Sequence, residues 1–469
     1  MSHLRRGSVL VAVALSAIAT AAVPTLSQAA TVTTVSAAPG DATGNYYQVT
    51  PSRLLDTRTG LGATKAAPLG DSGRVDVQVT GRGGVPTASS VSAVVLNLTG
   101  ITPTRGTYLT AYPAGASRPT ASTLNLSAGQ IRANTVTVPV SADGKVSVFN
   151  FLGSIDVAAD VVGYYSKDDS LGTGTQFQLA VPGRMFDTRA DGFPLYAGEN
   201  AGMAADFNDP ANPSDINTRI RALAVNITAL NATKGGYLQA YARNAQPPTT
   251  STLNLVPGKV VSNMAVVATD YDTDAKAPAI NVLNHSSGTV DVLVDVVGFY
   301  DVGSTTGLHY RPITPVRIID TRTTLGGHKA PIGYKETAGF TAPASVADTS
   351  TFALVANTTA VQPTKGTFLT VWDGATTLPD VSNLNPAAGD VVANATVAPL
   401  NDANGFSVFN RNGDTNVVMD VSGSFQYYTT GTASSPAKGT AANGADGPTA
   451  TRQAAAQPER HTFRAVSIR

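Results

Sequence analysis

One sequence pattern occurs three times along this chain of 469 residues. The motif Arg-x-x-Asp-Thr-Arg occurs at Arg53–Arg58, Arg184–Arg189 and Arg317–Arg322. Five other landmarks follow each copy in the same order, among them an Asn in an apolar run, a Leu-Asn pair after Ser and a closing Asp-Val-x-Gly. The period of about 130 residues is far longer than that of a solenoid repeat, so each copy can fold as a domain of its own.

The repeats and their flanks divide the chain into six segments. Arg5 and Arg6 precede an apolar run, Val9 to Val23, which has the length of a secretory signal and is too short to span a bilayer. We expect cleavage after Ala29 and no membrane span afterwards, hence a secreted protein, extracellular or cell-wall associated. The predicted segments are a signal peptide (1–29), a disordered leader (30–45), three repeats (46–166, 176–301 and 308–428) and a disordered low-complexity tail (429–469).

The pattern within each repeat is that of an all-β protein. Short runs rich in Val, Ile, Thr and Tyr, such as "RVDVQV", "TYLTAY" and "NTVTVPV", are separated by Gly, Pro and Asp. Eight or nine such runs in one repeat predict a β-sandwich, with the jelly roll as a candidate topology. The linkers are long enough for the three sandwiches to lie apart or to pack as an internal pseudo-trimer.

Composition excludes several classes of protein. The chain has no Cys, which removes disulfides and thiolate sites. The formal net charge is zero, and it becomes slightly negative when the two arginines of the signal peptide are removed. Binding of nucleic acid requires a basic face on the protein. The five histidines do not recur in register, and "DYDTD" (270–274) lacks the Gly and closing Glu of a calcium loop. We therefore predict no nucleic-acid partner, no metal and no cofactor.

The repeated charged residues have a structural and a catalytic interpretation. The closing strand of each repeat, as in "VAADVVG", is apolar on both faces, so its Asp needs a partner. The structural interpretation is a buried ion pair between that Asp and either arginine of the motif. The residues concerned are Arg53, Asp56, Arg58 and Asp160; Arg184, Asp187, Arg189 and Asp295; and Arg317, Asp320, Arg322 and Asp420.

The catalytic interpretation takes two carboxylates of one repeat, such as Asp56 and Asp160, as the acid and base of a glycosidase. Three tandem copies of a complete active site are unusual, and no repeat carries a second catalytic signature. We therefore expect a protein that is not an enzyme and assign no catalytic residue.

One strand in each repeat carries alternating aromatic residues. In "TYLTAY" the aromatic and the Leu/Ala positions lie on opposite faces, and one of the two faces must be core. If Leu and Ala face the core, the rings form an outer platform that suits a sugar, and three weak sites add avidity. Otherwise the rings fill the sandwich. The candidate ligand-binding residues are Tyr108, Tyr112, Tyr237, Tyr241, Phe368 and Trp372.

Taken together, the landmarks resemble a repeat found in secreted proteins of high-GC Gram-positive (actinobacterial) bacteria. The likeness rests on Pro-x-Arg-(Leu/Ile/Met)-x-Asp-Thr-Arg, Asn-(Leu/Ile/Thr)-Thr and Asp-Val-x-Gly-(Tyr/Phe), and it covers nearly all of 46–428. Repeat three departs from it in "DVSGSF" (420–425). The resemblance implies secretion and a non-catalytic role, and it carries over no catalytic residue.

These observations predict a secreted binding or structural module with a glycan or cell-wall polymer as the favoured ligand. A scaffold subunit that binds an extracellular protein is the alternative, and exposed apolar patches would favour it. A glycosidase-like enzyme is the second alternative, and paired carboxylates in an open cleft would favour that.

Overall fold

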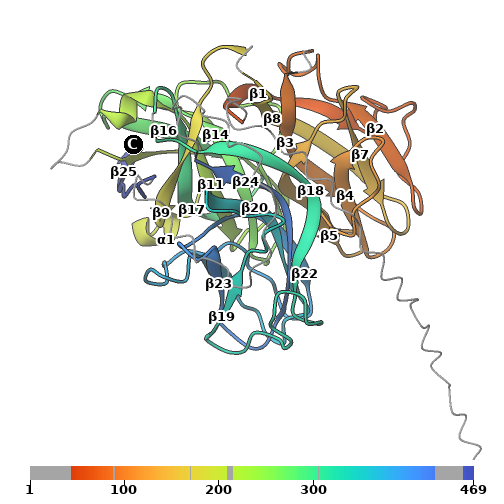
Figure 1. The fold of residues 1–469 in the computed structure, drawn as a ribbon. Coiled ribbons are helices and arrows are strands. Elements are labelled where there is room, and N and C mark those ends of the chain that lie inside the picture. The colour runs from red at the N-terminus through yellow and green to blue at the C-terminus, as the bar shows by residue number, and fades with distance from the viewer. Residues whose placement is uncertain are drawn as a thin grey trace, which may run out of the picture. The chain divides into compact units, whose positions relative to one another are not determined.

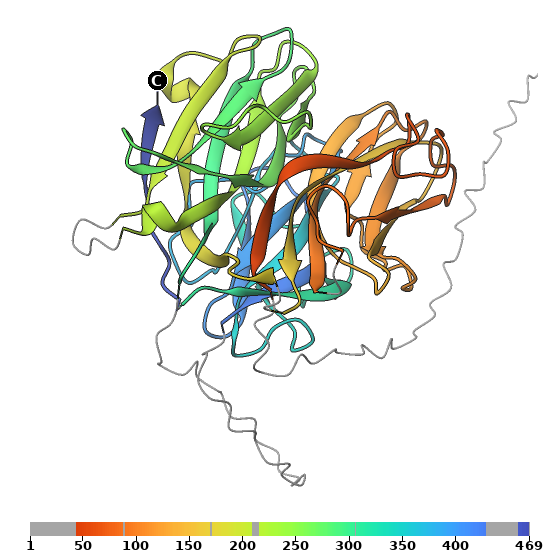
Figure 2. The ribbon, with the colours of Figure 1, turned by 90° about the horizontal axis from the view of Figure 1, so that it is seen from above.

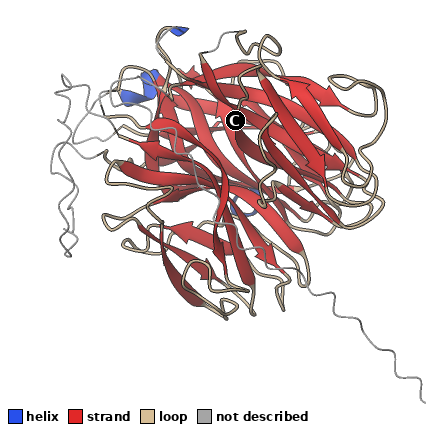
Figure 3. Cartoon of the chain, turned by 45° about the vertical axis from the view of Figure 1, so that its right-hand side comes forward, coloured by secondary structure: helices blue, strands red, loops and turns tan. Residues whose placement is uncertain are grey.

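The structure is a computed structural model that describes residues 44–87, 90–168, 171–208, 215–304, 306–427 and 458–468. The predicted signal peptide and most of the predicted leader lie outside these residues. Strands and loops make up almost all of the described chain (Figure 3). No helix among the described residues is long and apolar enough to cross a membrane.

Repeat 1 consists of eight strands in two sheets, coloured red to orange in Figure 1. The strands are β1 (Tyr46–Asp56), β2 (Arg74–Gln78), β3 (Val91–Ile101), β4 (Thr107–Pro113), β5 (Leu124–Leu126), β6 (Ile131–Pro139), β7 (Lys145–Asn150) and β8 (Asp156–Ser166).

Repeat 2 has the same plan with additions. Its strands are β9 (Gln176–Asp187), β10 (Asn200–Asp206), β11 (Ile220–Leu230), β12 (Gly236–Ala242), β13 (Leu253–Leu255), β14 (Val261–Ala268), β15 (Asp270–Asp272), β16 (Ala277–Asn284) and β17 (Asp291–Asp301). Two single turns of helix, α1 (Thr188–Asp191) and the 3-10 turn η2 (Ile216–Arg219), flank β10.

Repeat 3 follows the same plan with one strand fewer. It comprises β18 (His309–Asp320), β19 (Glu336–Thr341), β20 (Thr351–Val361), β21 (Leu369–Trp372), β22 (Val391–Pro399), β23 (Gly405–Asn410) and β24 (Asn416–Gln426). A last strand, β25 (Arg464–Ile468), comes from the C-terminal end of the chain.

The order of the strands identifies each sandwich as a jelly roll. In repeat 1 the sheets run β1-β8-β3-β6 and β2-β7-β4-β5, so each sheet interleaves early and late strands. Repeat 2 has β9-β17-β11-β14 opposite β10-β16-β12-β13, and repeat 3 has β18-β24-β20-β22 opposite β19-β23-β21. Two four-stranded sheets connected in this way are the eight-stranded jelly roll, and repeat 3 has the same order with one strand fewer. The expected all-β fold of three β-sandwiches is confirmed.

Every sandwich has its own apolar core, and the three sandwiches share a fourth. The cores of repeats 1, 2 and 3 contain Leu54 and Val148, Val225 and Val282, and Leu354 and Val408, respectively. The fourth core lies between the repeats and takes residues from the first-named sheet of all three. Those sheets are therefore buried on both faces, as the apolar closing strands predict.

Aromatic pairs connect the repeats through this shared core in a cyclic order. Tyr46 of repeat 1 packs on Tyr300 of repeat 2, with ring centres 4.4 Å apart. Phe177 of repeat 2 stacks on Phe425 of repeat 3 at 4.1 Å. Tyr310 of repeat 3 stacks on Tyr165 of repeat 1 at 4.2 Å and closes the cycle.

The Gly of the closing Asp-Val-x-Gly makes room for these rings. A Cβ at Gly163 would lie 2.2 Å from the Tyr46 hydroxyl oxygen, and one at Gly298 would lie 2.3 Å from the Phe177 ring. Atoms cannot approach so closely, so only Gly fits there. The glycine retained in the "DVSGSF" of repeat 3 has the same role towards Tyr310.

The starts of the repeats also pair with one another. Tyr46 forms an antiparallel bridge with Thr175, Phe177 forms one with Leu308, and the Tyr310 N–H donates to Gly44 O at 3.0 Å. Gly44, placed by the sequence in a disordered leader, is therefore part of this ring of pairings. The contacts of the three sandwiches are those of an internal pseudo-trimer and not of separate beads.

The tail departs from the sequence-based expectation at its end. β25 adds to the edge strand β10 of repeat 2, with Ala204 opposite Val466 and Asp206 opposite Arg464 (Figure 2). The expectation of disorder through 429–469 is therefore wrong for residues 458–468. Composition did not reveal this strand, because Ala, Thr and Gly dominate the preceding segment and "RAVSI" is only five residues long.

Candidate functional site

The Arg-x-x-Asp-Thr-Arg motif forms the same ion-pair network in each repeat. In repeat 2 the Arg184 Nε donates to Asp295 Oδ1 at 2.7 Å, and its Nη1 donates to Asp187 Oδ2 at 3.1 Å. Arg189 binds Asp187 through Nε and Nη2, at 2.9 and 2.8 Å. The first arginine of the motif thus holds the Asp of the closing strand, and the second holds the Asp of the motif.

Repeats 1 and 3 reproduce this network. Arg53 and Arg317 each lie 2.8 Å from their closing-strand partners, Asp160 and Asp420. The corresponding second pairs are Arg58–Asp56 at 2.7 Å and Arg322–Asp320 at 2.6 Å. Of the two arginines that the sequence left open as partners of Asp160, Asp295 and Asp420, the structure places the first one there.

Burial raises the pKa of a carboxyl group in this network, whereas pairing with arginine lowers it. Asp295 is fully buried, and desolvation raises its pKa to about 6 against the pull of Arg184. Desolvation also raises the pKa of Asp160. Asp187 is less buried, and its hydrogen bonds from Arg189 lower its pKa. The first arginine of the motif thus bonds both carboxylates, and the second arginine bonds the Asp of the motif as well.

The Thr of the motif ties the first strand to the last. The Thr57 Oγ1 donates to Asp156 Oδ1 at 2.7 Å and accepts from the Val157 N–H at 2.9 Å, across β1 and β8. Thr188 does the same with Asp291 and Val292. We predicted no role for this Thr from the sequence, although its occurrence in all three motifs is a signal of one.

The repeated Asn residues join the repeats to one another. The Asn97 Nδ2 of repeat 1 donates to Ser251 O of repeat 2 at 2.7 Å, and its Oδ1 accepts from the Asn263 Nδ2 at 3.0 Å. Repeats 2 and 3 repeat this contact: the Asn226 Nδ2 donates to Ser382 O at 2.6 Å, and the Asn394 Nδ2 donates to Asn226 Oδ1 at 2.9 Å.

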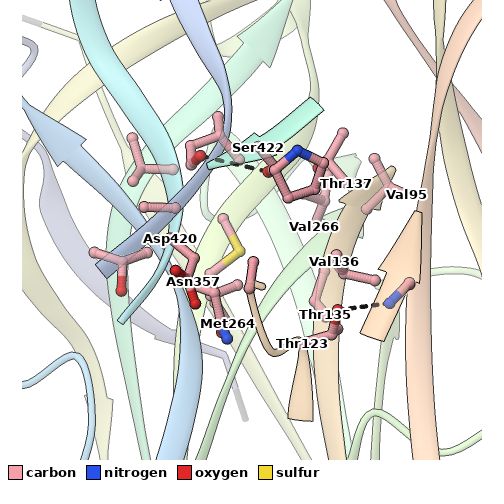
Figure 4. Close-up of a pocket in the computed structure, with 18 of the residues that line it drawn as sticks. Val95, Thr123, Thr135, Val136, Thr137, Met264, Val266, Asn357, Asp420 and Ser422 are labelled. Carbon is pink, nitrogen blue, oxygen red and sulfur yellow. Dashed lines mark hydrogen bonds between the residues drawn. The ribbon is translucent and has the colours of Figure 1, made fainter. Parts of the chain in front are cut away.

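Repeats 3 and 1 close the cycle. The Asn357 Nδ2 donates to Ser122 O, and the Asn134 Nδ2 donates to Asn357 Oδ1 at 2.8 Å. Figure 4 shows this junction, with Asn357 and Asp420 of repeat 3 beside Thr123 and Thr135 of repeat 1. We call the six residues of the cycle the asparagine ring: Asn97, Asn134, Asn226, Asn263, Asn357 and Asn394.

Backbone groups complete the asparagine ring. The N–H of Thr135 donates to Asn263 Oδ1, that of Met264 to Asn394 Oδ1 and that of Ala395 to Asn134 Oδ1, at 2.9 to 3.0 Å. Period two puts Asn97 on the face of Val95, which belongs to the shared core.

The platform hypothesis is wrong for half of its residues. Leu109 and Ala111 do face the sandwich core, but the second ring of each strand is buried as well, in repeat 3 beneath the loop that follows the strand. Tyr112, Tyr241 and Trp372 are only 3%, 8% and 6% exposed, and the Trp372 Nε1 donates to Thr376 O in that covering loop. These three rings are therefore not part of an exposed outer platform.

The other three rings lie at an open end of each sandwich. Tyr108 is half-buried and stacks on Phe151 at 4.7 Å, and Tyr237 stacks on His285 at the same distance. Phe368 holds the same place beside Arg411, whose N–H donates to Phe368 O at 3.1 Å.

A loop held by another repeated Asn brings further aromatic residues to this end. The Asn284 Nδ2 donates to the O atoms of Leu195 and Tyr196, and the Asn410 Nδ2 to those of Ile332 and Gly333. We call the result the aromatic ends, one per repeat: Tyr108 and Phe151; Tyr196, Tyr237 and His285; Tyr334, Phe368 and Arg411. Phe151, Tyr196 and Tyr334 are 44%, 56% and 62% exposed, respectively.

The aromatic end of repeat 3 forms a groove of about 610 Å³ with a segment of repeat 2. Tyr334 and Phe368 line it together with Asn385 and Arg411, and Lys259 comes from repeat 2. Lys335 lies 5.2 Å from the centre of the Tyr334 ring. Rings, amides and cations converge here, whereas no cluster of metal ligands occurs in the described part of the chain.

Comparisons with known proteins add little. No family model matches the chain, and no curated protein does. Among solved structures the chain is similar to one in "Life in the extremes: atomic structure of Sulfolobus Turreted Icosahedral Virus", at 8% identity and a TM-score of 0.18, over 83% of this chain and 92% of that one. A second is reported in "The Triple Jelly Roll Fold and Turret Assembly in an Archaeal Virus", at 8% identity and a TM-score of 0.17, over 82% and 90% of the two chains.

Proposed function

We propose that this protein is a secreted, non-catalytic module that binds a glycan or cell-wall polymer through its aromatic ends. The observation that supports this proposal most is the recurrence of an exposed ring at the same end of all three sandwiches. Exposed rings next to amides and cations suit the apolar face and the hydroxyls of a sugar. The repeated charged residues, by contrast, are engaged in ion pairs inside the fold.

The three aromatic ends differ in the residue after the second-to-last strand of each sandwich (β7, β16 and β23): Phe151, His285 or Arg411. The basic groove of repeat 3, with Lys259 and Arg411, favours an anionic polymer there. Three different sites on one chain give avidity towards a polymer that no single site would hold.

Replacing Phe151, Tyr196 and Tyr334 together by alanine is expected to lower retention on purified actinobacterial cell walls at least tenfold. A cosedimentation series with insoluble polysaccharides measures it. Tyr271→Ala is the matched control, because Tyr271 is exposed on β15, away from these ends. Unchanged retention of a folded triple variant, or no retention of the wild type, would contradict the proposal.

The scaffold alternative is supported by a different observation. The C-terminal strand adds to an edge of repeat 2, so this fold accepts an extended peptide.

A further inference from the structure

The C-terminal segment binds at the junction of repeats 2 and 3 before it becomes β25. The His461 N–H donates to Leu179 O at 3.0 Å, and the Val181 N–H donates to His461 O at 2.9 Å. Arg460 forms an ion pair with the buried Asp373 of repeat 3. This stretch is a peptide seated by backbone hydrogen bonds on β9 and by one charge from the neighbouring repeat.

A skip in strand register makes β9 available for this peptide. β9 pairs with β17 at Leu179 and again at Gly183, so residues 180–182 have no register partner on β17. Repeat 1 has the same skip, because β1 pairs with β8 at Gln48 and again at Ser52. Gln48 C=O and Thr50 N–H occupy the places of Leu179 C=O and Val181 N–H.

A groove lies beside this stretch of repeat 1, at its junction with repeat 2. Its volume is about 350 Å³, and Val49, Thr50 and Pro51 face Tyr241 and Ala242 across it. The pocket at the junction of repeats 3 and 1 extends into the shared core instead, and its volume is only about 40 Å³ (Figure 4). Of the three equivalent junctions, that of repeats 2 and 3 is thus filled by the chain itself, and that of repeats 1 and 2 has an open groove.

The open junction and the filled one differ at the residue that follows the second ring of the aromatic strand. Ala242 ends β12 one residue after Tyr241, as Asp373 follows Trp372 in repeat 3. The open groove therefore has Ala242 at the place of the carboxylate that holds Arg460. A peptide with arginine at this place would lack the partner that Arg460 has in Asp373.

We propose that the groove between repeats 1 and 2 binds an extended peptide of a partner protein, which adds to Val49–Pro51 as residues 460–463 add to β9. In this partner peptide, the residue that takes the place of Arg460 is small and uncharged. Strand addition supplies affinity through the backbone, and the pocket beside it supplies specificity.

Two labelled peptides and the full-length protein test this proposal by fluorescence anisotropy. One peptide is residues 458–463, and the other carries the substitution R460A. The wild type is expected to bind the R460A peptide at least tenfold more tightly than the native one. Ala242→Asp is expected to reverse that preference, and Ala116→Asp, on an exposed loop, is expected to leave it unchanged.

Thr50→Pro supplies an independent variant, because proline removes the N–H donor and is expected to weaken binding at least tenfold. Absence of binding by either peptide, or R460A binding that neither Ala242→Asp nor Thr50→Pro alters, would overturn the proposal. Tighter binding of the native peptide to the wild type would also overturn it, and would assign the groove to the C-terminal segment of a second copy.

Discussion

Replacing Asp295 by alanine is expected to lower the free energy of unfolding by about 3–5 kcal/mol, the usual cost of removing one member of a buried ion pair. Asp295 is fully buried, and Arg184 reaches it through both Nε and Nη2. Without the carboxylate, Arg184 keeps only its contact with Asp187. Urea denaturation of the full chain at pH 7 measures the loss.

The same variant has a second readout in the pH dependence of stability. The pKa of Asp295 is about 6 in the folded protein, above its ordinary value of 3.8. A carboxyl group whose pKa rises on folding stabilises the fold, and this contribution is complete at pH values below its pKa in the unfolded chain. The contribution is lost as the pH rises through the folded-state pKa of about 6. The alanine variant lacks this fall in stability between about pH 4 and 6.

Arg74→Ala is the control for this ion pair. Arg74 and Asp76 form an exposed pair at 3.2 Å, whose loss is expected to cost at most about 1 kcal/mol. An Asp295→Ala protein as stable as the Arg74→Ala protein would show that the repeated motif does not stabilise the fold.

Asn394→Ala is expected to be the second large effect, on the order of 3 kcal/mol, since each buried polar group left unpaired costs about 1–3 kcal/mol. The substitution removes the partner of the Met264 N–H and of Asn226 Oδ1, both in repeat 2. The same denaturation series measures it.

The control for the asparagine ring is Asn244→Ala, because Asn244 is exposed in repeat 2. We expect its stability to equal that of the wild type. If Asn394→Ala were equally harmless, the asparagine ring would not be what joins the repeats.

The sequence predicted those features of a single repeat that follow from hydrophobic periodicity and from the burial of a strand. Period-two runs gave the all-β fold, and the doubly apolar closing strand pointed to an ion pair for Asp160, Asp295 and Asp420. Strand order was not predictable, because the jelly roll pairs strands far apart in the chain, such as β1 with β8.

Local sequence patterns could not predict the contacts between repeats either. Asn97 lies in an apolar strand, and only the docking of repeat 2 explains why a polar amide is needed there. The platform prediction failed at Tyr112, Tyr241 and Trp372 because alternation says which face a ring takes, and not whether a loop covers that face. The open rings Tyr196 and Tyr334 lie on loops, where no period marks them.

Differential scanning calorimetry of the full-length wild-type protein tests the central claim most directly, namely that three jelly rolls share one core and unfold as one unit. We expect a single transition in which the van't Hoff enthalpy equals the calorimetric enthalpy, as for any cooperative two-state unit. Three separable transitions, or a van't Hoff enthalpy about one third of the calorimetric one, would contradict it and would show that the repeats are independent domains.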